Sequence, residues 1–312
     1  EIVFTGGSSG THKGVQLNGN GLNSVVQSLD YITDIRPGET FMGNLPQFFA
    51  FGKVSLHFAL ANNANLHLTL NAMPKDFKNE LYKIQPQGVF AGPIQWEYFI
   101  NDTFKEISSE MKGIDFSLLS AKDEKEYLKS LEEILKNANR KDLLMPWLKM
   151  GVSGGEQLRQ FTEKVCNLVF KYLDVNDDLW NGLGMTELWA PTAVKQGNLH
   201  TFGTVGKIIP YNSFRVVNPE TFEDVKKGEI GLLLVTGPGM MLGYYNNPAE
   251  NQKSFKVLDG TKYYISGDIV RENERGELEY VDRLKMETDI IIKKGMMTNE
   301  ILLRQEKIIR GY

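Results

Sequence analysis

Apolar and polar positions follow two alternating patterns over the first two thirds of this chain. Short apolar runs at 40–45 and 88–91 predict strands, whereas apolar residues at every third or fourth position in 22–31 and 161–173 predict helices. Further helices are predicted within 54–70 and over 76–84, 95–111 and 122–141, the last a charged, solvated outer helix. Because strands and helices take turns, we expect an α/β fold with a parallel sheet and helices on its faces.

The pattern changes beyond residue 197. Strand-like runs at 213–217 and 230–235 are short and are separated by turn residues. Short strands joined by turns predict an antiparallel β subdomain. A further strand is expected at 289–294, near the end of the chain.

Composition narrows the class of protein. The 312 residues are 41% hydrophobic and 24% charged, with a formal net charge of −4 and no basic stripe, so we expect no nucleic-acid partner. No apolar run reaches the length of a membrane span, and we expect no signal peptide. The one cysteine, Cys166, falls in a helical apolar stretch and is expected in the core, which favours a reducing, cytoplasmic setting.

A glycine-rich stretch at 5–14 follows the first apolar run. Its ten residues hold four glycines, four hydroxyl side chains and one lysine, Lys13. Glycines let successive backbone N–H groups point into one concavity, and hydroxyls and the ammonium add donors, so the stretch suits a polyanion. A plain surface turn has the same composition. A Walker A loop does not fit, because Thr11 and His12 separate Gly10 from Lys13.

Two carboxylates follow glycines farther along the chain. Thr186 and Glu187 could offer a hydroxyl to a phosphate and a hard anionic oxygen to Mg²⁺, the groups that an ATP-consuming site needs. Asp268 follows a strand-like run and a glycine, where a carboxylate can accept hydrogen bonds from both hydroxyls of a ribose. The plain alternatives are an exposed carboxylate at 187 and a free aspartate in a turn at 268.

In their order along the chain, these stretches resemble the motifs of the adenylate-forming superfamily, which includes acyl- and aryl-CoA synthetases. The matching stretches are 5–14, 153–158, 183–187, 228–231, 243–246, 264–268 and 276–285. The resemblance implies an adenylation domain at 1–284, with a parallel-sheet α/β part and a β subdomain, that lacks its upstream portion. It also implies a hinge and a remnant of the small C-terminal domain at 285–312.

The resemblance assigns site residues. ATP would be bound by Thr5, Ser8, Ser9, Gly10, Thr11, Lys13, Gly154, Gly155, Glu156, Leu183, Gly184, Met185, Thr186, Asp268 and Arg283. Catalysis would involve Lys13, Thr186 and Glu187, with Mg²⁺ on Glu187. Lys285 would be the hinge residue, and Lys307 faintly resembles the catalytic lysine of the C-terminal domain. Tyr244 and Tyr245 are expected to be structural.

The implied reaction has two steps. A carboxylic acid attacks the α-phosphorus of ATP to give an acyl-adenylate and pyrophosphate, and the thiol of coenzyme A, or alternatively of a carrier protein, then displaces AMP. Amino-acid-activating members hold the substrate ammonium with an aspartate near the aromatic stretch 47–52, and none occurs there, which favours a fatty or aromatic acid. That stretch lines the acyl pocket in the family, although Phe48, Phe49 and Phe51 could equally pack in the core.

Three departures from the family pattern leave other functions open. Gly7 replaces a serine, His12 replaces a proline, and Leu183 replaces the aromatic residue that stacks on adenine. A degenerate member that binds nucleotide without turnover would show the same departures. A P-loop NTPase is the second alternative, and it would release ADP without any acid, whereas the adenylate-forming reaction releases AMP.

Overall fold

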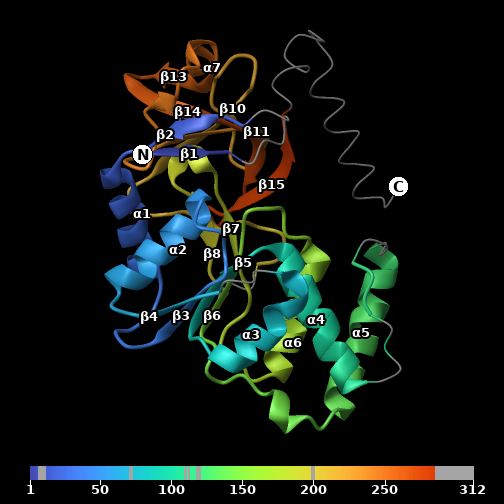
Figure 1. Ribbon diagram of the computed structural model, residues 1–312. Coiled ribbons are helices and arrows are strands. Elements are labelled where there is room, and N and C mark those ends of the chain that lie inside the picture. The colour runs from blue at the N-terminus through green and yellow to red at the C-terminus, as the bar shows by residue number, and fades with distance from the viewer. Residues whose placement is uncertain are drawn as a thin grey trace.

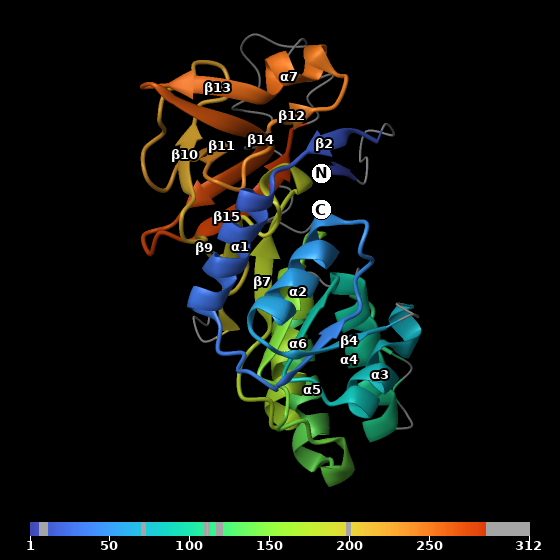
Figure 2. The same cartoon turned by 60° about the vertical axis from the view of Figure 1, so that its left-hand side comes forward.

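A computed structural model describes residues 1–5, 12–69, 73–108, 111, 113–116, 121–197 and 201–284 (Figure 1). A helix-covered sheet forms one part of the molecule, and a strand-rich part lies above it in Figure 2. The predictions for Gly7, Ser8, Ser9, Gly10, Thr11, Lys285, Lys307 and the strand at 289–294 fall outside the described residues. None of the helices in the described ranges combines the length and apolar character that crossing a membrane requires.

The helix-covered part is built on a seven-stranded sheet. Its order is β4 (Asn65–Leu68), β3 (Thr40–Gly43), β5 (Gly88–Ala91), β6 (Met150–Ser153), β7 (Trp180–Leu183), β8 (Ala193–Lys195) and β9 (Lys207–Ile208). Neighbouring strands from β4 to β7 are parallel, as predicted. The pairs β7–β8 and β8–β9 are antiparallel and were not predicted, because the connection from β7 to β8 contains the 3₁₀ turn η3 (Thr186–Leu188) instead of a crossover helix.

Helices cover both faces of this sheet. They are α1 (Gly19–Ile32), α2 (Ala50–Ala61), α3 (Phe77–Ile84), α4 (Pro93–Ile107), α5 (Ala121–Asn137) and α6 (Gln160–Tyr172), with 3₁₀ turns η1 (Pro74–Asp76), η2 (Lys141–Leu143) and η3 (Thr186–Leu188). In Figure 1, α1 and α2 lie on the left of the sheet, and α3, α4 and α6 lie on the right. The predicted helices are confirmed, with ends that differ by a few residues.

The core explains why the central strands read as continuous apolar runs. In β5, Phe90 packs with α1 and α2, whereas Val89 and Ala91 pack with the helices of the opposite face. Since both faces are covered, every position of the strand is buried. Cys166 is buried in the second of these clusters, as expected, and burial raises the pKa of its thiol.

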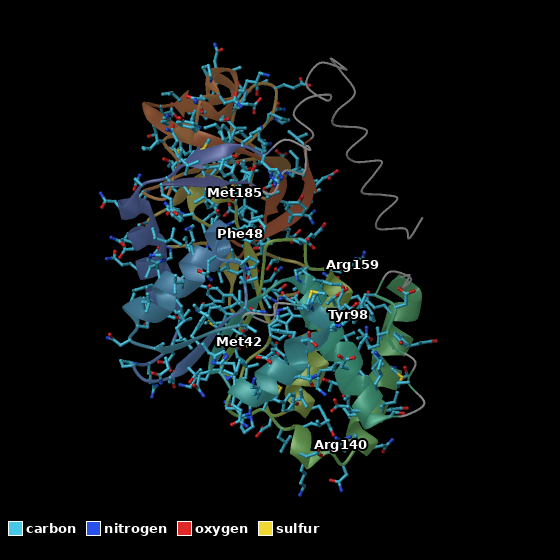
Figure 3. The ribbon with its side chains drawn as sticks, in the orientation of Figure 1. Met42, Phe48, Tyr98, Arg140, Arg159 and Met185 are labelled. Atoms are coloured by element: carbon cyan, nitrogen blue, oxygen red, sulfur yellow. The ribbon has the colours of Figure 1, made fainter. Side chains whose placement is uncertain are left out.

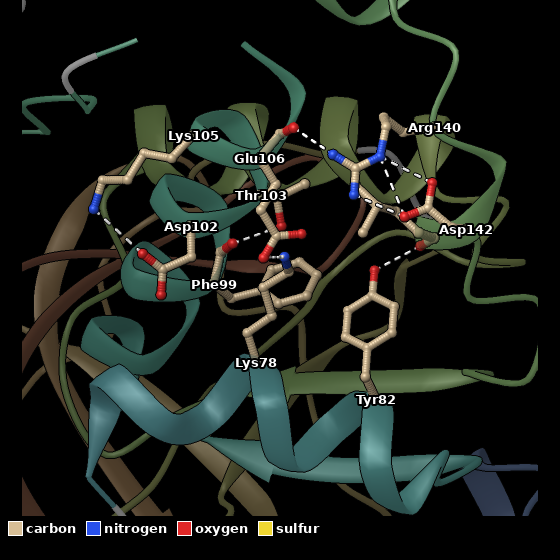
Figure 4. A network of polar contacts seen from close by, with 10 residues as sticks. Lys78, Tyr82, Phe99, Asp102, Thr103, Lys105, Glu106, Arg140 and Asp142 are labelled. Carbon is tan, nitrogen blue, oxygen red and sulfur yellow. Dashed lines mark hydrogen bonds and ion pairs between the residues drawn. The ribbon is translucent and has the colours of Figure 1, made fainter. Parts of the chain in front are cut away.

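Polar contacts tie the helices of the right-hand face together at their outer ends (Figure 4). Lys78 of α3 lies 2.5 Å from the carboxylate of Glu106 in α4, and Tyr82 donates to the carbonyl of Leu143 at 2.5 Å. Arg140 pairs with Asp142 at 2.7 Å and also donates to the Glu106 carbonyl. The network anchors η2 to α3 and α4, and we assign it no chemistry.

The strand-rich part is antiparallel, as the sequence predicts. Its small sheet has the order β1 (Ile2–Phe4), β2 (Gly14–Gln16) and β12 (Gly243–Tyr244). The larger sheet has the order β10 (Ser213–Val217), β11 (Ile230–Thr236), β14 (Thr261–Glu272) and β13 (Phe255–Leu258), with β15 (Leu278–Arg283) paired to β14. Helix α7 (Pro248–Ser254) follows β12. The pairing of β2 with β12 brings the beginning of the chain beside residues more than two hundred positions later.

Candidate functional site

Six predicted nucleotide-binding residues meet at the junction of the two parts. A polar hollow of about 130 Å³ lies beyond the carboxyl ends of β6 and β7. Its lining includes Gly155, Glu156, Leu183 and Gly184 from the sheet part and Asp268 and Arg283 from the β part. A site at the carboxyl ends of parallel strands is the usual place for a ligand in an open α/β sheet.

Asp268 lies within β14, so it does not follow the strand as expected, and the alternative of a free aspartate in a turn is also wrong. It is 1% exposed, and its backbone N–H donates to the hydroxyl of Ser266 at 3.0 Å. Arg283 lies opposite it on β15, with 3.3 Å between the guanidinium and one carboxylate oxygen. Burial raises the pKa of Asp268 to about 6, opposed by Arg283 and reinforced by the charge of Glu187.

The carboxylate oxygens of Asp268 accept no hydrogen bond from any residue that the structure describes. Arg283 offsets the charge of this carboxylate, but a buried carboxylate that receives no hydrogen bond is still unfavourable, and a ligand with donors would satisfy it. A vicinal diol, as in a ribose, would supply two donors to two oxygens. The site therefore fits the sugar of a nucleotide.

Glu187 lies in η3, directly after β7, where the sequence predicts a metal ligand. It is buried, and the hydroxyl of Tyr244 donates to its Oε1 at 2.7 Å, so the alternative of an exposed carboxylate is wrong. Glycine is required at 184, because a Cβ there would lie 2.7 Å from the Cβ of Ala190. Met185 is buried and Thr186 is partly buried beside Glu187.

Lys13 is the last residue of the glycine-rich stretch before β2. The hydroxyl of Thr5 accepts its N–H at 3.2 Å, and Thr5 donates its own N–H to the Lys13 carbonyl at 3.0 Å, which fixes the two ends of the stretch together. The ammonium lies 2.5 Å from the carboxylate of Glu250 in α7 and 5.2 Å from the centre of the Tyr244 ring. The cation thus lies on the aromatic face of Tyr244.

Tyr244 connects the two charged groups. Its ring contacts Lys13, its hydroxyl donates to Glu187, and the hydroxyl of Tyr264 lies 3.5 Å from its own. Burial raises the pKa of Tyr244, and the nearby Glu187 charge adds to the shift, so the phenol stays protonated and remains a donor. Sequence reasoning gave Tyr244 a purely structural role, since nothing in the pattern shows that β12 pairs beside Lys13.

Glu187 could hold a Mg²⁺ ion together with phosphate oxygens. One oxygen is bound by Tyr244, which leaves the other for a metal. Within the described ranges, no group of three histidine, cysteine or acidic residues could form an all-protein metal site. Mg²⁺ is commonly held by one or two carboxylates plus substrate phosphates and water, so a single carboxylate fits this ion.

An apolar hollow of about 40 Å³ adjoins the polar one. The two share Gly155, Gly182, Leu183 and Gly184 in their linings. The apolar walls include Phe51, Phe90, Met150 and Trp180. Gly154, predicted to bind the nucleotide, lines the apolar hollow and not the polar one, whereas Gly155 lines both and Glu156 lines the polar one.

The aromatic stretch is divided between this hollow and the surface. Phe51 stacks on Phe90 with 5.1 Å between the ring centres and lines the hollow. Phe48 and Phe49 are exposed, so core packing is the wrong interpretation for both. Figure 3 labels Phe48 and Met185 in the region between the lower, helix-covered part and the upper, strand-rich part.

The chain belongs to the AMP-binding enzyme family, whose model matches residues 2–245. This confirms the identification with the adenylate-forming superfamily and its large-domain fold. The chain is 28% identical to the long-chain-fatty-acid–CoA ligase of Haemophilus influenzae over 315 residues, which cover 96% of this chain and 47% of the relative. It is 24% identical to the long-chain-fatty-acid–acyl-carrier-protein ligase AEE15 of Arabidopsis thaliana over 307 residues, 86% of this chain and 41% of the relative.

Solved structures show the same fold. A long-chain-fatty-acid–CoA ligase (FadD1) from Archaeoglobus fulgidus matches with a TM-score of 0.69 and 20% identity, over 91% of this chain and 51% of that one. The chain spans less than half the length of the two curated relatives named above.

Proposed function

We propose that this chain forms the adenylation domain of an acid–thiol ligase, with the domain at 1–284 and the hinge region at 285–312. The enzyme activates a carboxylic acid with ATP, releases pyrophosphate, and forms a thioester with coenzyme A. The observation that carries the proposal is the contact of Tyr244 with both Lys13 and Glu187, together with the polar hollow that Asp268 lines with Leu183 and Gly184. An apolar hollow for the acid lies beside them.

The sugar and base of ATP occupy the polar hollow in this proposal. Asp268 accepts hydrogen bonds from both ribose hydroxyls, which satisfies the oxygens left without donors. Arg283, held opposite Asp268 by strand pairing, contributes positive charge near the ribose and α-phosphate. The base lies against Leu183 and the backbone of 154–156, where an apolar side chain covers one face of the purine.

The phosphates extend toward Lys13. Its ammonium offsets charge on the β- and γ-phosphates as pyrophosphate departs, and the hydroxyls of Thr5 and Thr186 donate to phosphate oxygens. Ser8, Ser9, Gly10 and Thr11 keep their predicted roles in the same cradle. Mg²⁺ on Glu187, when bound, neutralises part of the phosphate charge. Tyr244 holds the Glu187 carboxylate in place by its hydrogen bond.

The acid lies in the apolar hollow, with its carboxylate toward the α-phosphorus. None of the described residues that line it is charged, so a fatty or aromatic acid suits the hollow better than an amino acid. Coenzyme A is the proposed acceptor. A carrier-protein thiol is the second candidate, favoured by the similarity to a relative named as an acyl-carrier-protein ligase.

Three further assignments remain predictions. They are Lys285 as the hinge residue, Lys307 as a second catalytic lysine, and a cytoplasmic setting.

The test is acid-dependent exchange of labelled pyrophosphate into ATP, measured on the full-length protein with a panel of fatty and aromatic acids. We expect exchange with at least one acid, and AMP release matching thioester formation once coenzyme A is added. ATP binding without exchange for any acid would indicate the degenerate, nucleotide-binding alternative. Release of ADP in the absence of acid would favour the NTPase alternative and contradict the proposal.

A further inference from the structure

The cation that the proposed function assigns to the phosphates already has a partner. Lys13 and Glu250 form an ion pair with 2.5 Å between the ammonium and the carboxylate, and their side chains are 25% and 23% exposed. Glu250 has no role in the proposed reaction, because its carboxylate beside Lys13 repels the phosphates of ATP.

The backbone of Glu250 is held in place by the start of helix α7. It lies in the first turn of α7, where the side chain of Asn247 accepts its N–H at 3.3 Å. The next residue, Asn251, accepts the N–H of Tyr244 at 2.6 Å and donates to the Tyr244 carbonyl at 2.9 Å. Because Tyr244 pairs with Val15 of β2, helix α7 is anchored to the strand that directly follows Lys13.

Stability alone explains this arrangement poorly. A partly exposed ion pair contributes little to folding, and α7 is already anchored by Asn247 and Asn251. The Lys13 ammonium has three donors, but a carboxylate and a polyphosphate on the same ammonium repel each other. A polyphosphate therefore binds Lys13 more favourably once the Glu250 carboxylate has moved away.

We propose that Glu250 is the counterion of Lys13 when no phosphate is bound. ATP displaces the Glu250 carboxylate from Lys13 on binding, and Glu250 pairs with Lys13 again when pyrophosphate leaves. The inference rests on the proposed function for the place of the phosphates. It makes Glu250 a positioning residue that acts through Lys13 and weakens the binding of ATP and of pyrophosphate. AMP, which has no β- or γ-phosphate, does not compete with it.

The test compares Glu250→Gln with the unaltered full-length protein by isothermal titration calorimetry with MgATP, pyrophosphate and AMP, in the absence of acid. The substitution keeps the shape of the side chain and removes its charge. We expect the dissociation constants of ATP and pyrophosphate to fall by about three- to tenfold, on the scale of a partly screened ion pair. The AMP dissociation constant should not change, which also shows that the variant is folded.

Two further variants isolate the effect. Glu39→Gln is the matched control, because Glu39 pairs with Lys149 at similar exposure, 19% and 34%, and should leave all three constants unchanged. In the background Lys13→Ala, the substitution Glu250→Gln should lose most of its effect on ATP, since its effect runs through the lysine.

Weaker or unchanged ATP binding in Glu250→Gln would overturn the inference, and so would an equal shift in the AMP constant, which indicates a structural role. Because these titrations contain no acid, they are independent of the exchange assay. Failure of exchange with normal ATP binding would contradict the proposed function and leave the counterion inference standing.

Discussion

The candidate site has a sugar end at Asp268 and a phosphate end at Lys13, and the two ends differ in the contacts that the protein itself supplies. At the sugar end, Asp268 is buried to 1% exposure, and its oxygens accept no hydrogen bond from a described residue. At the phosphate end, Lys13 is partly exposed and is paired with Glu250. At the sugar end, Arg283 pairs with Asp268 but leaves its oxygens without hydrogen bonds, so a ribose can be added without breaking a contact. At the phosphate end, the ligand must replace Glu250 on Lys13.

The surrounding structure accounts for this difference. Asp268 belongs to a twelve-residue strand that pairs with β11, β13 and β15, so its position is fixed on both sides. Lys13 precedes a three-residue strand in a small sheet, and its long side chain can turn from one anion to another. Rigid support suits recognition of a constant group, and a mobile cation suits a phosphate chain that departs during the reaction.

The largest expected effect is a loss of folding stability when a buried ion pair next to the polar hollow is broken. Glu163 and Lys195 form an ion pair in which both side chains are 1% exposed, and Glu163 also accepts the N–H of Gly203, which lines the polar hollow. Glu163→Gln leaves a buried lysine unpaired and should lower the free energy of unfolding by roughly 3–5 kcal/mol in urea titrations. Glu124→Gln, which breaks the more exposed pair with Lys164, should cost below about 1 kcal/mol. Equal losses in the two variants would contradict this explanation.

Replacement of Lys13 tests the phosphate end alone. Lys13→Ala should slow acid-dependent pyrophosphate exchange by about 10²- to 10³-fold, the usual loss for one electrostatic group in a phosphoryl- or acyl-transfer site. Calorimetry should show AMP affinity unchanged, because the sugar end is intact. A parallel loss of AMP binding would mean that the two ends are not separate.

Substitution of the buried carboxylate tests the sugar end. Asp268→Asn removes one acceptor for the ribose hydroxyls, so the dissociation constants of ATP and AMP should rise together, by about 10- to 100-fold. Lys13→Ala, by contrast, should weaken ATP and spare AMP. If Asp268→Asn weakens only ATP, the ribose does not lie on Asp268.

The last expected effect is a pH dependence of folding stability. Asp268 has a pKa of about 6 in the folded protein against an ordinary 3.8, so the folded state holds its proton more tightly than the unfolded state does. Between these values stability falls as pH rises, and the loss is at most about 3 kcal/mol. The ligand-free protein should thus lose stability between pH 4 and pH 6 by urea unfolding, and Asp268→Asn should lack this component. An identical pH profile for both proteins would contradict the assignment.

Much of the fold followed from local pattern. Because β5 is covered on both faces, its apolar run identifies it as a strand, and the periodic spacing in α1 and α6 identifies the helices. The strands β8 and β9 could not be predicted, because the turn after β7 sends the chain back antiparallel without a distinctive residue pattern. Asp268 was expected to follow the strand because Gly267 precedes it, but the strand continues through that glycine.

Site residues could be predicted where a local stretch of sequence carries the chemistry. They could not be predicted where the pairing of distant strands brings the residues together. Glu187 and Asp268 lie in the stretches 183–187 and 264–268, and the local resemblance of these stretches to family motifs was enough to select them. The roles of Tyr244 and Glu250 depend on the pairing of β12 with β2, which joins segments more than two hundred residues apart. No local pattern contains that information.

A crystal structure of the full-length protein with Mg²⁺ and a non-hydrolysable ATP analogue would show whether Lys13, Glu187 and Asp268 serve one nucleotide. We predict both ribose hydroxyls on the Asp268 carboxylate, the β- and γ-phosphates on Lys13, and Glu250 without its present partner. A nucleotide bound away from Asp268, or phosphates that leave the Lys13–Glu250 pair intact, would contradict the proposed site.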